Sequence, residues 1–114
     1  MISSIRHVGF VVSDLENSLK FYSDILGLKI YRRFIEEGDF IDSLTGIKNV
    51  KLEWAKLIIP QGGLIELLQY HSHPDPDTSN NLSRSSSNRL GCSHVALTVE
   101  NLSTLHQEII SNGF

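Results

Sequence analysis

The chain has 114 residues, of which 40% are hydrophobic and 20% charged, as expected for one globular domain. Ten basic and thirteen acidic residues give a net charge of −3, which argues against a nucleic-acid-binding protein. No apolar run reaches the roughly 20 residues of a membrane-spanning helix, and the start has no secretory signal core.

The chain has one cysteine, Cys92, which cannot form an internal disulfide and fits a reducing compartment. We read this cysteine as structural, because no basic cluster or helix start lies beside it to activate the thiol. These features predict a cytoplasmic protein with no nucleic acid and no membrane among its partners. The expected partners are a small-molecule substrate and a second copy of the chain.

Two segments resemble each other at a constant offset of 87 residues: HVGFVVSDL from His7 and HVALTVENL from His94. Each predicts a short strand that leads into a helix, with Asp14 or Asn101 as the N-cap. The helical stripes that follow are Leu15, Leu19, Tyr22 and Leu26 before Gly27, and Leu102, Leu105 and Ile109 before Gly113.

Further strands are predicted at 28–35, 54–59 and 64–70, with a turn at 60–63 and a short helical turn at 40–44. Residues 1–73 thus form a β-α-β-β-β module. Residues 74–91, rich in Pro, Ser, Asn and Asp, predict a flexible linker. Residues 92–114 repeat only the first strand and helix, so this second module is expected to be incomplete. The predicted fold class is α+β.

Strand alternation places His7 and Gly9 on the face that points away from the predicted helix, and His94 and Ala96 likewise. For either histidine taken singly, a simple hydrogen bond to a neighbour is the more common role. Their equivalent placement in both repeats, each beside a very small residue, favours instead one shared site with room for a ligand.

Glu66 is the third candidate, because it lies in the apolar strand 64–70, where an unpaired carboxylate is costly. It can alternatively face solvent at a sheet edge or pair with Arg32 or Arg33. Two imidazoles and one carboxylate suit Zn²⁺, Ni²⁺, Co²⁺, Mn²⁺ or Fe²⁺. The remaining histidines are expected outside this site, His71 and His73 in a solvated loop and His106 on an exposed helix face.

The run from His7 to Leu28, especially F-Y-x-x-I-L-G-L from Phe21, resembles the vicinal-oxygen-chelate superfamily of glyoxalases, bleomycin-resistance proteins and dioxygenases. This resemblance implies paired β-α-β-β-β modules whose curved sheets surround a divalent metal ion, often in homodimers. In the glyoxalase I and methylmalonyl-CoA epimerase branches, the matching metal ligands are His7, Glu66 and His94. The fourth ligand, a glutamate that also transfers protons, falls in a strand after Phe114.

A carboxylate at Glu66 favours those two branches, since the dioxygenase branch takes no ligand from this strand. The expected function is a glyoxalase-like, metal-dependent lyase or isomerase that transfers a proton next to a carbonyl group. This class includes lactoylglutathione lyase-like and acyl-CoA epimerase-like activities. The alternatives are a small-molecule-binding or resistance protein of the same fold, and a metal-dependent dioxygenase.

Overall fold

The computed structural model describes residues 1–76, 87–88, 90 and 93–114. Its elements, in chain order, are β1 (His7–Val11), α1 (Leu15–Leu19), the π-helix η1 (Lys20–Ile25), β2 (Lys29–Glu36), α2 (Asp39–Thr45), β3 (Leu52–Ile58), β4 (Leu64–Tyr70) and α3 (Leu102–Ser111). The first module therefore has the expected β-α-β-β-β order, with α2 inserted where the sequence predicts a short helical turn. The α+β fold class is confirmed.

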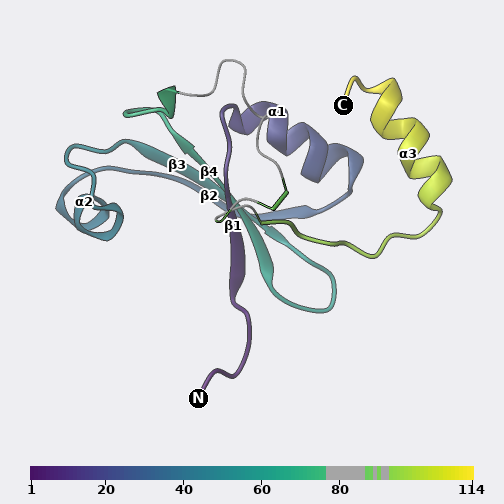
Figure 1. Cartoon of the computed structure of the whole chain (residues 1–114), viewed down its shortest axis with the longest axis horizontal. Helices are drawn as coiled ribbons and strands as arrows, with labels where there is room; N and C mark the ends of the chain where they lie inside the picture. Colours follow the sequence, from purple (N-terminus) through teal and green to yellow (C-terminus); the bar gives the residue numbers. More distant parts are fainter. Residues whose placement is uncertain (77–86, 89, 91–92) are drawn as a thin grey trace.

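The four strands form a curved, open sheet in the order β1-β4-β3-β2 (Figure 1). Strand β1 pairs with β4 in parallel, while the β3–β4 and β2–β3 pairs are antiparallel. Helix α1 packs on one face of this sheet. On the other face, which we call the open face, Ile41 of α2 packs with Val50, Leu52 and Trp54 near one end.

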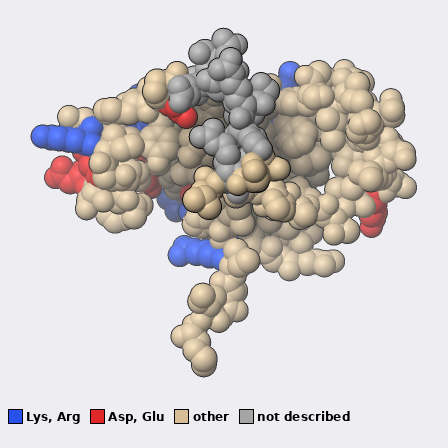
Figure 2. Space-filling model, viewed as in Figure 1, with Lys and Arg blue, Asp and Glu red and all other residues tan. Residues whose placement is uncertain are grey.

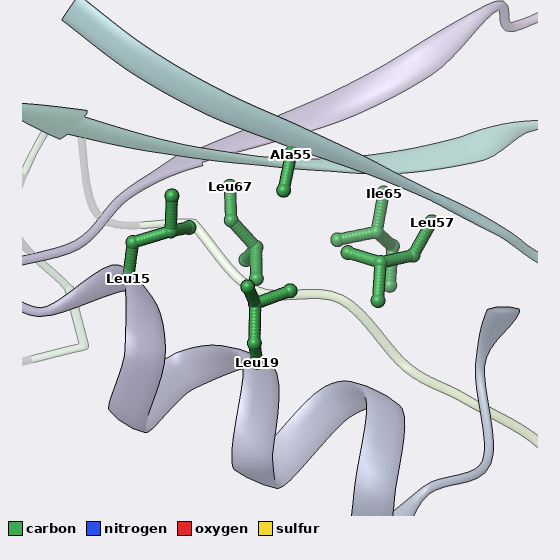
Figure 3. Close-up of a cluster of buried hydrophobic side chains, with 6 residues drawn as sticks. All are labelled: Leu15, Leu19, Ala55, Leu57, Ile65 and Leu67. Atoms are coloured by element: carbon green, nitrogen blue, oxygen red, sulfur yellow. The ribbon is translucent and has the colours of Figure 1, made fainter. Parts of the chain in front are cut away.

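The main core lies between the sheet and α1. Figure 3 shows Leu15 and Leu19 pointing from the helix toward the side chains of β3 and β4. The buried members of this cluster are Leu15, Leu19, Ala55, Leu57, Ile65 and Leu67. Burial of this apolar surface stabilises the sheet and fixes which side chains of each strand face away from α1.

The first helix begins as the sequence predicts and then changes its winding. The side chain of Asp14 accepts a hydrogen bond from the backbone N–H of Asn17, as an N-cap should. After Leu19 the helix continues as the wider π-helix η1. At the end of η1, the backbone N–H of Leu26 donates a hydrogen bond to the carbonyl of Phe21, five residues earlier. Gly27, with φ of 74°, then supplies the expected left-handed residue.

Residues 93–99, expected to form a strand, carry neither helix nor strand in this structure. A strand is defined by its ladder of backbone hydrogen bonds, and this segment has no such ladder here. It runs as an extended connection toward α3 (Figure 1). The predicted second helix is present as α3, and Phe114, which follows it, packs on η1, where its ring centroid lies 5.3 Å from that of Phe21.

Asn101 precedes α3 as expected but does not cap it through its side chain. It has left-handed backbone angles, with φ of 51°, and makes no side-chain hydrogen bond to the helix. An N-cap side chain reaches the first turn from an extended backbone, so the left-handed conformation explains the difference from Asp14.

The expected linker at 74–91 falls largely outside the described residues, and Cys92 lies outside them as well. The linker and the module boundaries at 73 and 92 therefore remain predictions. Within the described ranges no helix is long and apolar enough to cross a membrane. Figure 2 shows the charged side chains of the visible face scattered among uncharged ones, with no broad patch of one sign.

Candidate functional site on the open face of the sheet

The register of the sheet gathers the predicted residues of the first module on the open face. Gly9 lies opposite Glu66 in the β1–β4 pair, and Lys56 lies opposite Glu66 in the β3–β4 pair. Phe10 and Val12, the alternate residues of the first strand segment, pack with the core under α1. The alternation predicted from the sequence is therefore correct for this strand.

His7 and Glu66 are in direct contact. The Nε2 atom of His7 lies 3.1 Å from Oε2 of Glu66, and the carboxylate belongs to a residue that is only 9% exposed. Gly9 lies beside this contact: a Cβ at position 9 would lie 3.8 Å from Oε2 of Glu66, an ordinary van der Waals distance, so a larger side chain there would crowd the carboxylate. Two of the three predicted site residues are thus neighbours on one face.

The other oxygen of Glu66 is held by a lysine. The Nζ atom of Lys56 lies 3.3 Å from Oε1 of Glu66, and it also lies 4.5 Å from the ring centroid of Trp54. Glu66 therefore faces neither solvent nor Arg32 or Arg33, which were the alternatives from the sequence. Its partners within the described chain are an imidazole and an ammonium group.

Arg33 belongs to a second polar cluster, on the face that α1 covers. It bonds to Glu16 and, through Nε at 2.7 Å, to Oε1 of Glu53, while His71 donates to Oε2 of Glu53 at 2.7 Å. His71 is therefore not the simply solvated loop residue that the sequence suggests. Burial alone would raise the pKa of Glu53, but the bonds from His71 and Arg33 outweigh it and lower that pKa. The pKa of Arg33 is raised, and the largest cause is its side-chain hydrogen bond to Glu16.

His7 and Glu66 fit part of a metal site. Ligand atoms about 2.1 Å from one ion lie about 3.0–3.4 Å apart when they are adjacent in its coordination sphere. The His7–Glu66 separation of 3.1 Å falls in that range, which is also the range of a direct hydrogen bond between an imidazole and a carboxylate. Lys56 opposes it, because an ammonium group on the same carboxylate competes with a cation for its charge.

His94 is not brought to this pair. It is exposed in the segment 93–99, and among the described residues no three His, Cys, Asp or Glu side chains gather closely enough to hold an ion. The three-residue ligand set therefore remains a prediction. His106 lies exposed on α3, as expected.

A hollow of about 280 Å³ opens at the ends of β1 and β4. The residues that line it include the apolar Val11, Ile47 and Tyr70 and the polar His73 and Asp75. Tyr70 and Val11 lie on the open face by register, so the hollow adjoins the same side of the sheet as Glu66. An apolar concavity beside polar groups is typical of small-molecule sites.

Sequence reasoning missed Lys56 and Glu53. Both lie in β3, where they are charged residues within an apolar strand, the same signal that identified Glu66. Applying that signal to 52–58 would have found both residues. The signal would not have predicted the ion-pair partners of the two residues, because those partners depend on the register between strands.

Comparison with known proteins agrees with this architecture. The family model described as "Glyoxalase/Bleomycin resistance protein/Dioxygenase superfamily" matches residues 4–114. The fold and the open sheet face thus define a glyoxalase-type protein. The chain belongs to the glyoxalase/bleomycin resistance protein/dioxygenase superfamily, as its resemblance implied.

Two solved structures are similar to the chain. A glyoxalase family protein from Bacillus cereus is 25% identical with a TM-score of 0.85, the match covering 99% of this chain and 74% of that one. The protein SMU.1112c is 19% identical with a TM-score of 0.52, covering 99% of this chain and 77% of that one, and shows likeness of fold alone. No curated protein is significantly similar.

Proposed function

We propose that the protein is a glyoxalase-like, metal-dependent lyase or isomerase that transfers a proton next to a carbonyl group. The observation that carries this proposal is the buried Glu66 carboxylate in contact with His7 on the open face. A carboxylate and an imidazole that share one small space are suited both to holding a divalent ion and to moving a proton.

The proposed metal ligands are His7, Glu66 and His94, for Zn²⁺, Ni²⁺, Co²⁺, Mn²⁺ or Fe²⁺. When bound, such an ion supplies a Lewis acid that stabilises negative charge on a substrate oxygen. His94 would have to reach the His7–Glu66 pair by a rearrangement of residues 93–99 or from the second chain of a homodimer. The site's own residues hold the carboxylate: His7 and Lys56 flank its two oxygens.

The surroundings of Glu66 favour proton transfer. Trp54 and Leu68 lie opposite each other in the β3–β4 pair, on the open face, and Trp54 is buried. Apolar side chains of this kind keep water from a reacting group and strengthen the charge interactions beside it.

A second candidate is a small-molecule-binding or resistance protein of the same fold that needs no metal ion. The Lys56–Glu66 contact favours it, because the ammonium group already balances the carboxylate charge. A metal-dependent dioxygenase, the third member of the superfamily's range, has no specific support from the contacts of Glu66.

Metal titration with a calorimetric readout separates the candidates. We expect wild type to bind one of the five divalent ions, and His7→Gln and Glu66→Gln to weaken that binding at least about tenfold, as loss of one ligand bond implies. His106→Gln, on the exposed side of α3, is the matched control and should bind like wild type. Equal binding by all four proteins would contradict the proposal.

We further propose that the protein works as a homodimer in the cytoplasm. The superfamily often pairs modules between chains, and an unpaired segment at 93–99 with exposed Leu97 and Val99 is consistent with an apolar partner. Light scattering over a concentration series tests the dimer. A monomer at every concentration would refute it.

A further inference from the structure

An irregularity in β2 brings a second cation to the open face. Ile30 pairs with Leu57 but Arg32 pairs with Lys56, so Tyr31 is an extra residue in the strand. Strict alternation from Ile30 would have turned Arg32 toward α1. Because of the extra residue, Arg32 lies beside Lys56, on the face that carries Glu66.

Arg32 and Lys56 share one aromatic neighbour. The guanidinium carbon of Arg32 lies 5.9 Å from the ring centroid of Trp54 and 5.6 Å from that of Phe34. The Nζ atom of Lys56 lies 4.5 Å from the Trp54 centroid. Such cation–π contacts hold both cations against the rings of Trp54 and Phe34, and they leave the positive charges of the cations unneutralised.

The charges of this group do not balance. Lys56 is offset by Glu66, but among the described residues no carboxylate pairs with Arg32, whose neighbouring side chains are the two aromatic rings. By contrast, the next residue, Arg33, forms ion pairs with Glu16 and Glu53 on the other face of the sheet. The group formed by Arg32, Lys56 and Glu66 therefore carries one uncompensated positive charge beside apolar rings.

The geometry points to an anion subsite formed by Arg32 and Lys56 over Trp54 and Phe34, whose ligand is the carboxylate of a small organic acid with an apolar body. A guanidinium binds a carboxylate in a two-pronged geometry, and the rings suit the apolar body. The single excess charge favours a monoanion over a dianion. The subsite deepens the proposed function and rests on it for the identity of this face as the substrate side.

Trp54, the one tryptophan of the chain, makes the subsite measurable. The experiment follows Trp54 fluorescence in the whole chain, with a chelator present, during titration with benzoate, neutral benzamide or inorganic phosphate. We expect a saturable change with benzoate and a much weaker one with benzamide and phosphate. Because the assay contains no free metal ion, its failure is distinct from failure of metal binding.

The variants are Arg32→Gln, Lys56→Gln and, as the matched control, Lys48→Gln, which removes an exposed lysine outside the subsite. Arg32→Gln should weaken benzoate binding at least about tenfold, Lys56→Gln should weaken it less, and Lys48→Gln should not change it. Equal benzoate affinity in wild type and Arg32→Gln would overturn the assignment. Equal binding of benzamide, or tighter binding of phosphate, would also overturn it.

Circular dichroism of each variant keeps the comparison interpretable. Arg32 lies on the edge strand and is exposed, so Arg32→Gln should unfold at the wild-type temperature. If it does not, Arg32→Lys serves in its place, since it keeps the charge but loses the two-pronged geometry. Intermediate affinity of Arg32→Lys supports the subsite, and wild-type affinity contradicts the two-pronged contact.

Discussion

Gly9 and Glu66 lie opposite each other in the parallel pair β1–β4, and because Gly9 has no side chain, there is space beside the carboxylate of Glu66. A Cβ at position 9 would lie 3.3 Å from Cδ1 of Leu68 and 3.8 Å from Oε2 of Glu66. The first distance is tight but involves the end of a flexible side chain. The position therefore has room for a methyl group and for little more.

Enlarging Gly9 should separate folding from site function. We expect Gly9→Ala to keep the wild-type free energy of unfolding within about 1 kcal/mol. Gly9→Leu should lose about 1–3 kcal/mol through crowding and should displace Glu66 from His7. Urea unfolding and metal titration measure the two effects. Metal binding by Gly9→Leu equal to wild type would show that the space beside Glu66 is unimportant.

Removing the ammonium group of Lys56 should strengthen metal binding. Lys56 and an ion would both draw on the charge of Glu66, so Lys56→Gln should raise the affinity for a divalent ion by about tenfold. Lys48→Gln controls for the change in net charge. An unchanged or lower affinity in Lys56→Gln would mean that Lys56 supports the metal site and does not compete with it.

Glu53 should stabilise the fold in a pH-dependent way. Its pKa is lower in the folded state than in the unfolded chain, so its ionised form stabilises the fold. That contribution is complete above about pH 4.3, the ordinary value of glutamate, and is lost as pH falls through the folded pKa. Glu53→Gln should therefore cost about 1–3 kcal/mol at neutral pH.

The difference in unfolding free energy between wild type and Glu53→Gln should shrink on acidification, which denaturant unfolding at a series of pH values measures. Glu108→Gln, on exposed α3, is the control and should show no such trend. A difference that stays constant from neutral pH to below pH 4, about the range where carboxylates titrate, would rule out the ion-pair role of Glu53.

The two predicted N-caps should behave differently. Asp14→Ala should lower the free energy of unfolding by about 0.5–2 kcal/mol, because the bond to the N–H of Asn17 is lost. Asn101→Gly should change it by no more than about 0.5 kcal/mol, because its side chain makes no cap bond and glycine accepts the left-handed angles. Thermal unfolding of both variants checks this, and equal losses would contradict it.

The sequence predicted local features best. The strand expected at 64–70 coincides with β4, and the turn at 60–63, the Asp14 cap and the left-handed Gly27 are all present. Each of these depends on residues close in the chain, where periodicity and turn chemistry act directly. The buried carboxylate of Glu66 was also predictable, because a charge in an apolar strand requires a partner.

Features that depend on distant pairing were not predictable. The extra residue Tyr31 exchanges the sheet faces on which Arg32 and Arg33 lie. The residues near Tyr31 in the sequence carry no pattern that predicts this bulge. The strand expected at 93–99 requires a neighbouring strand, and the structure gives that segment none. The winding of η1 was likewise missed, because an apolar stripe at helical spacing does not distinguish α- from π-helical hydrogen bonds.

Anomalous diffraction from crystals grown with a divalent ion tests the central claim, that His7 and Glu66 bind metal, most directly. We predict one strong peak about 2.0–2.3 Å from Nε2 of His7 and from a carboxylate oxygen of Glu66, with His94 of the same or the second chain as a further ligand. In that metal-bound structure, Lys56 should no longer contact the carboxylate of Glu66. A structure with bound ions elsewhere, and with Lys56 still paired to Glu66 beside His7, would contradict the account.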